Sequence, residues 1–102
     1  MQRSSRRPLD GHVVLLTGAG SGIGRASAHR LAAEGARLVL VGRRASLLDD
    51  VAEEIRAAGG QAWPVPAAVD DGRQVDRLLR GVRDELGAVD VLVNCAGSAS
   101  AV

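Results

Sequence analysis

The sequence predicts an α/β fold built on a parallel sheet, with the element order βαβαβαβ. Short apolar runs alternate with segments of helical periodicity along the whole chain. The runs lack the polar/apolar alternation of a half-exposed strand, which indicates strands that are covered on both faces. Strands and helices that alternate in this way form parallel sheets with right-handed crossovers.

The composition limits the size and class of the protein. A chain of 102 residues accommodates one small domain, and 46% hydrophobic with 25% charged residues is typical of a globular protein. A formal net charge of +1 gives no argument for a nucleic-acid partner, and no apolar run is long enough to cross a membrane. The single cysteine, Cys95, cannot form an internal disulfide, so we expect a reducing, cytoplasmic location.

The first part of the chain contains a tail, a strand and a helix. Residues 1–8 are basic and are expected to be disordered, whereas residues 9–102 are expected to form the folded domain. The run at 13–16 predicts the first strand, and residues 25–34 predict a helix that ends at a glycine. His29 is expected to be solvated on that helix. The residues expected on its packed face are Ile23, Ala26, Ser27 and Leu31.

A second strand and helix follow, and then a third strand. Residues 38–41 predict the second strand, and the pair Ser46 and Asp49 predicts the start of the second helix. The acidic side chains of this helix, Glu54 among them, are expected to form a solvated face. Residues 62–66 predict the third strand, whose two prolines place it at a sheet edge because proline cannot donate to the hydrogen-bond ladder.

The last elements leave part of the sheet open. Asp71 is the expected cap of a helix over residues 72–86, and residues 89–93 predict a fourth strand. The first two helices should cover one face of the sheet, and only this third helix the other. We therefore expect the fourth strand to lie at an exposed edge, and the chain to self-associate through that edge and the uncovered face.

The segment Thr17 to Gly24, with the sequence TGAGSGIG, lies between the first strand and the first helix. Glycine allows backbone conformations that a side chain forbids, and it lets the main chain approach a ligand closely. The first turn of the following helix directs unpaired N–H groups and a partial positive charge to the same place. A tight turn without a ligand is the alternative, but the position between strand and helix favours a phosphate site.

Five features in register resemble the short-chain dehydrogenase/reductase family. They are Leu9-Asp10-Gly11 before the first strand, the Thr-Gly-x-x-x-Gly-x-Gly loop, Arg43 after the second strand, Val69 after the third, and Asn94-Cys95-Ala96-Gly97 where the family usually has Asn-Asn-Ala-Gly. The resemblance implies a Rossmann-type, doubly wound parallel sheet, here incomplete. It also implies an NAD(P)-dependent oxidoreductase that transfers hydride between the nicotinamide cofactor and an alcohol or carbonyl substrate, represented by its cofactor-binding half.

The resemblance implies a binding position for each part of the dinucleotide. Ala68 stands where the family commonly has an Asp that faces the adenine amino group, so that hydrogen bond is in doubt. The resemblance implies Ser21 and Ile23 at the pyrophosphate, Arg43 at the adenosine ribose, Val69 at the adenine, and the segment from Asn94 to Gly97, with Asn94, Ala96 and Gly97 as binding residues, near the inner ribose. The glycine loop adds Gly18, Gly22 and Gly24 to the expected cofactor-binding residues, and the segment after the second strand adds Arg44.

The residues that follow the second strand predict the choice of cofactor. In NAD sites an acidic residue about 20 positions past the glycine loop accepts hydrogen bonds from the ribose 2′-hydroxyl. Counting from Gly22 leads to Gly42, so no carboxylate is expected there, and Arg43 and Arg44 come next. Guanidinium groups bind phosphate in a planar, two-point fashion. The pattern predicts NADP rather than NAD, with a solvated arginine pair as the alternative.

The sequence offers no candidate catalytic residue and no metal site. The family uses a Tyr-x-x-x-Lys pair and a Ser beyond its Asn-Asn-Ala-Gly motif, whereas this chain contains no tyrosine and no lysine. Ser98 and Ser100 have no residue to activate them, and Cys95 has no nearby histidine and is expected to be a packed thiol. We expect the chain alone to be inactive in hydride transfer, and its substrate is not predicted. A stand-alone nucleotide-binding module and a non-functional remnant stay open as alternatives.

Overall fold

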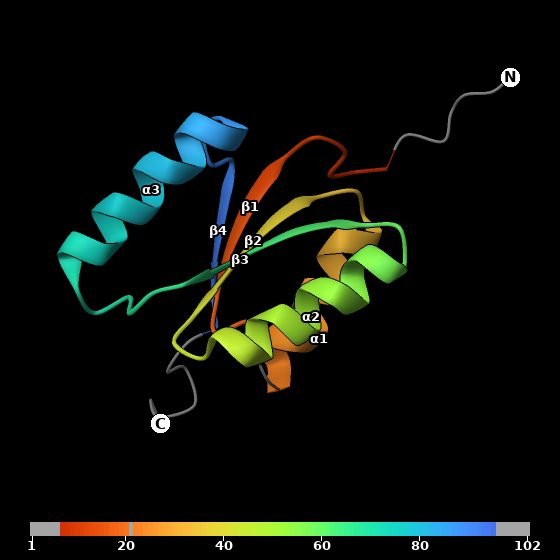
Figure 1. Ribbon diagram of the computed structural model, residues 1–102. Coiled ribbons are helices and arrows are strands. Elements are labelled where there is room, and N and C mark those ends of the chain that lie inside the picture. The colour runs from red at the N-terminus through yellow and green to blue at the C-terminus, as the bar shows by residue number, and fades with distance from the viewer. Residues whose placement is uncertain (1–6, 21, 96–102) are drawn as a thin grey trace, which may run out of the picture.

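The computed structural model describes residues 7–20 and 22–95, which form a parallel sheet with helices on both faces (Figure 1). The strand order is β3-β2-β1-β4, and every strand pair is parallel. The predicted βαβαβαβ order is therefore confirmed. The elements are β1 (Val13–Thr17), α1 (Gly22–Ala33), β2 (Arg37–Gly42), α2 (Ala45–Ala57), β3 (Gln61–Pro66), α3 (Gly72–Leu86) and β4 (Val91–Asn94).

Two apolar cores lie on opposite faces of the sheet. Helices α1 and α2 cover one face and α3 covers the other, as Figure 1 shows. Successive residues of β1 alternate between them: Val14 and Leu16 pack under α1 and α2, whereas Val13 and Leu15 pack under α3. All four are at most 3% exposed. Burial on both faces explains the continuous apolar runs of the sequence.

Helix α1 packs through a different face from the one expected. Its buried residues are Gly24, Ala28 and Ala32, which recur every four positions, whereas Ile23 is 76% exposed. Of the residues predicted for the packed face, Leu31 is partly buried and packs against the core, whereas Ile23 and Ala26 are exposed, so the prediction is wrong for these two. Glycine and alanine occupy this face because they let the helix axis lie close to the sheet.

The helix ends follow local rules with one exception. Asp71 caps α3, since its side chain accepts a hydrogen bond of 3.0 Å from the backbone N–H of Arg73, as predicted. Helix α2 begins instead at Ala45 with Arg44 as its cap and no side-chain cap hydrogen bond. Ser46 therefore lies within the first turn, and its prediction as the start signal is wrong.

The two outer strands have different surroundings. Strand β3, with its prolines, lies at one edge, as predicted, and pairs only with β2 among the described strands. Strand β4 lies at the other edge and pairs with β1, which confirms its predicted place. Its Leu92 is 66% exposed and Val91 is 38% exposed. The described part of the chain thus leaves apolar side chains of β4 open to solvent.

We predict that Gly24→Ala destabilises the fold. A Cβ atom at this position would lie 1.8 Å from the backbone oxygen of Gly18, a contact that only a backbone shift can relieve. Overpacking of this kind costs about 1–3 kcal/mol or more, which exceeds the gain of about 1 kcal/mol from the higher helix propensity of alanine. Urea denaturation, followed by circular dichroism, measures the change in the free energy of unfolding.

The matched control for this experiment is Gly81→Ala in the middle of α3. A Cβ atom there has no neighbour within 4 Å, so the same substitution should stabilise the chain by up to about 1 kcal/mol. Equal stabilisation by both substitutions would contradict the close contact between α1 and the glycine loop.

Candidate functional site

The carboxyl ends of the four parallel strands lie at one edge of the sheet, and a hollow of about 590 Å³ lies at this edge beside the ends of β1, β2 and β3. Loops that follow β1, β2 and β3 form its walls. Open parallel sheets commonly bind ligands at this edge, next to the point where the strand order reverses. Here that point lies between β1 and β4. The residues that line the hollow are Gly18, Gly20, Val41, Gly42, Arg43, Arg44, Leu47, Leu48, Ala67, Val69 and Asp70.

The glycine loop forms the wall that follows β1. Gly18 and Gly22 have φ angles of +70° and +56°, a left-handed conformation that favours glycine. The loop is also tied to the end of the neighbouring strand, because the N–H of Gly18 donates a hydrogen bond of 2.9 Å to the carbonyl oxygen of Val41. Helix α1 then begins at Gly22 with no acidic residue in its first turn. Its first N–H groups are thus not neutralised by a carboxylate of that turn.

The loop that follows β3 forms the opposite wall. The N–H of Ala67 donates to the oxygen of Gly42 at 2.8 Å, which joins this loop to the end of β2. The N–H of Ala68 donates to Oε1 of Gln74 on α3, also at 2.8 Å. Val69 follows these two anchored residues in the loop, and its side chain is 43% exposed and lines the hollow. No sequence signal points to this role of Gln74, because its partner is a backbone group.

An ion pair lies at the rim of the hollow. Arg43 Nη2 donates a hydrogen bond of 2.8 Å to Asp70 Oδ2, and both side chains are 70% exposed. Position 42 carries no carboxylate, as expected from the sequence, but Arg43 nevertheless has an acidic neighbour. The carboxylate belongs to Asp70 in the loop after β3. Because β2 and β3 are predicted to be parallel, the loops that follow them leave the sheet at the same edge, and this could have placed Asp70 near Arg43. Arg44 is also exposed and lines the same hollow.

The other implied site residues lie outside the lining of the hollow or outside the described part of the chain. Gly22, Ile23 and Gly24 form the start of α1, where Ile23 is exposed and Gly24 is buried. Asn94 ends β4, and its Oδ1 accepts a hydrogen bond of 2.7 Å from the Thr17 hydroxyl. Ser21, Ala96 and Gly97 lie outside the described residues.

Cys95 is half-buried and packs against the core under α1 and α2, as expected for a packed thiol. Within residues 7–20 and 22–95, no cluster of three or more His, Cys, Asp or Glu side chains could hold a metal ion. In the same part of the chain, no helix is long and apolar enough to span a membrane.

Comparison with known proteins places this chain in a family. The family described as short chain dehydrogenase matches residues 12–102. The chain is 44% identical over 90 residues to a glycine betaine reductase of Emericella nidulans, covering 88% of this chain and 7% of that protein. It is 39% identical over 99 residues to a fatty acyl-CoA reductase of Mycobacterium tuberculosis, covering 95% of this chain and 34% of that protein.

A solved structure extends the similarity to the fold. A metagenomic short-chain oxidoreductase in complex with NADP superposes with a TM-score of 0.80 at 39% identity, over 82% of this chain and 38% of that one. The chain spans between 7% and 38% of the length of these three proteins.

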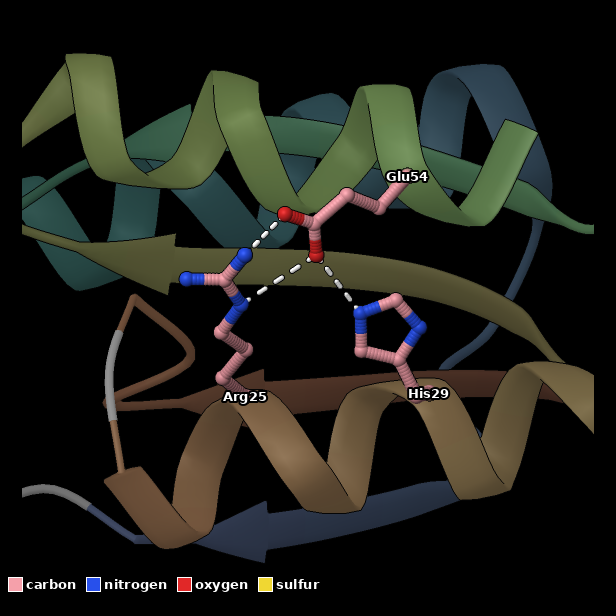
Figure 2. Close-up of polar contacts among 3 residues, drawn as sticks. All are labelled: Arg25, His29 and Glu54. Atoms are coloured by element: carbon pink, nitrogen blue, oxygen red, sulfur yellow. Dashed lines mark hydrogen bonds and ion pairs between the residues drawn. The ribbon is translucent and has the colours of Figure 1, made fainter. Parts of the chain in front are cut away.

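A cluster of three polar side chains joins α1 to α2 beside the glycine loop, as Figure 2 shows. Glu54 of α2 accepts hydrogen bonds from Arg25 and from His29, whose Nε2 lies 2.7 Å from Oε1 of Glu54. The prediction that His29 and the acidic face of α2 are simply solvated is wrong for this pair. Arg25 immediately follows Gly24, so the cluster fixes the first turn of α1 against α2.

We predict that Glu54 stabilises the fold at neutral pH and that this contribution is lost in acid. The hydrogen bond from His29 is the largest effect and lowers the pKa of Glu54; partial burial opposes it, and Arg25 lowers the pKa further. A lowered pKa in the folded state gives stability that is present above the unfolded value, about 4.3, and is lost as the pH falls through the folded value. The melting temperature of Glu54→Gln should therefore lie below that of the unmodified chain at pH 7, and the difference should shrink below about pH 4.

Glu53→Gln is the control, because Glu53 is exposed on the same helix and has no ion pair within the described residues. The prediction would be contradicted if the melting-temperature difference for Glu54→Gln stayed the same in acid. It would also be contradicted if Glu53→Gln produced the same difference.

Proposed function

The chain belongs to the short-chain dehydrogenase family, and we propose that it forms the cofactor-binding part of an NADP-dependent oxidoreductase. The reaction we propose for the whole protein is hydride transfer between the nicotinamide cofactor and an alcohol or carbonyl substrate. The observation that supports this proposal most is the hollow at the carboxyl edge of the sheet, which combines a glycine loop, an exposed apolar side chain and two arginines.

The glycine loop fits a pyrophosphate. Gly18 and Gly22 adopt left-handed conformations, so the backbone can turn its N–H groups toward a ligand without a side chain in the way. The exposed start of α1 adds the partial positive charge of a helix N-terminus. We assign the pyrophosphate to Gly18, Ser21, Gly22, Ile23 and Gly24.

The rim of the hollow fits the adenosine end of the cofactor. The exposed side chain of Val69 provides an apolar surface for the adenine ring, while Arg43 and Arg44 face the solvent where a 2′-phosphate would lie. The N–H of Ala68 is already bonded to Gln74, and its side chain has no hydrogen-bonding group, so it does not replace the family's adenine contact. We assign the inner ribose to Asn94, Ala96 and Gly97.

The residues of this chain bind and orient the cofactor, and the bound nicotinamide supplies the hydride. The chain contains no tyrosine and no lysine, so the proton transfer that accompanies hydride transfer in the family has no matching residues here. We also propose a cytoplasmic protein, because its single cysteine cannot form an internal disulfide.

We predict that the chain binds NADP about tenfold more tightly than NAD, which corresponds to about 1.4 kcal/mol. A charge-assisted hydrogen bond contributes about 1.5–3 kcal/mol, and the exposure of Arg43 reduces that value through screening. Titration calorimetry of both cofactors with the unmodified chain and with Arg43→Ala measures the preference. The substitution should reduce the NADP affinity and leave the NAD affinity nearly unchanged.

Arg80→Ala controls for the loss of one positive charge, because Arg80 is exposed on α3 and does not line the hollow. Equal affinities for the two cofactors in the unmodified chain, or the same loss with either arginine substitution, would refute the assignment of Arg43.

We also propose that the isolated chain self-associates through β4. Leu92 and Val91 expose apolar side chains on a strand that pairs on one side only within the described residues. Sedimentation velocity should show species larger than the 10.5 kDa monomer as the concentration rises, and Leu92→Arg should shift them toward the monomer.

Leu79→Arg is the control, because Leu79 is 42% exposed on α3 and does not belong to the sheet. A monodisperse monomer at all concentrations, with a sharp and reversible melt, would contradict self-association and favour an autonomous nucleotide-binding module.

A further inference from the structure

We propose that Asp70 is a specificity-determining residue of the nucleotide site, and that its carboxylate limits the preference of the site for a 2′-phosphate. The inference rests on the proposed function, since it concerns the same hollow. In NAD sites the acidic residue that binds the ribose stands at the end of the second strand. Here the carboxylate at the rim belongs instead to the loop after β3. The site then holds both a guanidinium and a carboxylate at the position of the adenosine ribose.

The geometry places the two charges in direct contact at the rim. Arg43 follows the last residue of β2, and Asp70 lies 27 positions later in the loop after β3. Their side chains meet at 2.8 Å, and both line the hollow together with Val69. A ligand whose adenine rests on Val69 would therefore present its ribose to this ion pair.

The ion pair opposes a phosphate in two ways. The hydrogen bond to Asp70 occupies Nη2 of Arg43, so a phosphate must displace the carboxylate or use the remaining N–H donors of the guanidinium. If the carboxylate stays in place, it lies within a few ångströms of the phosphate oxygens, and like charges at that separation repel. Either route lowers the affinity for the phosphorylated ribose.

The same carboxylate favours an unphosphorylated ribose. A 2′-hydroxyl can donate a hydrogen bond to an ionised carboxylate, which accepts such bonds at both oxygens. Asp70 is 70% exposed and contacts Arg43 through Oδ2, so its carboxylate is accessible to such a donor. The net effect is a site that discriminates less between the two cofactors than its two arginines would imply.

The fold does not depend on Asp70, so its removal isolates the effect on binding. An ion pair this exposed contributes little to stability. The neighbouring Asp71, not Asp70, caps α3, and the backbone of the loop is held by Gly42 and Gln74. Asp70→Asn should therefore retain the structure of the loop while it removes the negative charge.

The test compares two adenosine nucleotides that differ only at the 2′ position. Adenosine 2′,5′-bisphosphate and adenosine 5′-monophosphate are titrated by calorimetry into the 102-residue chain and into Asp70→Asn at low ionic strength. The ratio of their affinities should shift toward the bisphosphate by roughly three- to fivefold in Asp70→Asn, the size expected for one exposed charge pair. In an Arg43→Ala background the same substitution should produce a smaller shift, because the guanidinium that Asp70 holds is absent.

Asp84→Asn is the control for net charge, because Asp84 is exposed in the last turn of α3 and does not line the hollow. An unchanged affinity ratio in Asp70→Asn, in a chain that binds both nucleotides, would overturn this inference and leave the proposed function intact. An equal shift with Asp84→Asn would also overturn it. The failure of every variant to bind either nucleotide would overturn the proposed function and this inference together.

Discussion

The close contact between Gly24 and the carbonyl oxygen of Gly18 is the constraint on which the candidate site depends. No Cβ atom fits at position 24, so the helix can lie directly on the loop that precedes it. Ala28 and Ala32 continue the buried face of α1 along the sheet. Arg25 joins the first turn of the helix to Glu54 on the neighbouring helix. The start of α1 is consequently held at the carboxyl end of β1, next to the glycine loop that lines the hollow through Gly18 and Gly20.

Parallel pairing then brings the remaining groups to the same edge. The register of β1, β2 and β3 aligns Thr17, Val41 and Val65, so the loops that follow these strands leave the sheet at one level. This alignment places Arg43 beside Asp70, although the two belong to different βα units. The charge at the rim is therefore a balance of two arginines and one aspartate rather than the purely basic surface that the segment after β2 implies.

The sequence predicted what depends on local rules, and it failed where segments distant in the chain determine the result. The strand order along the chain, the cap at Asp71 and the edge position of β3 follow from patterns within a few residues. The contact of Glu54 with His29 spans 25 positions, and that of Arg43 with Asp70 spans 27, so neither has a local signal. The packed face of α1 was predicted only in part, at Leu31, for a related reason: apolar periodicity favours Ile23, whereas the distance between helix and sheet selects glycine and alanine.

The most direct measurement is a titration of the isotopically labelled chain with NADP, followed by the chemical shifts of its backbone amides. If the hollow at the carboxyl edge binds the adenosine end, the largest changes should occur at Gly18, Gly20, Arg43 and Val69. A second cleft of about 360 Å³ lies between β3 and α3 and includes Trp63 and Leu86, which makes it an internal comparison. Changes confined to that cleft, or no saturable changes at all, would contradict a nucleotide site formed by the glycine loop.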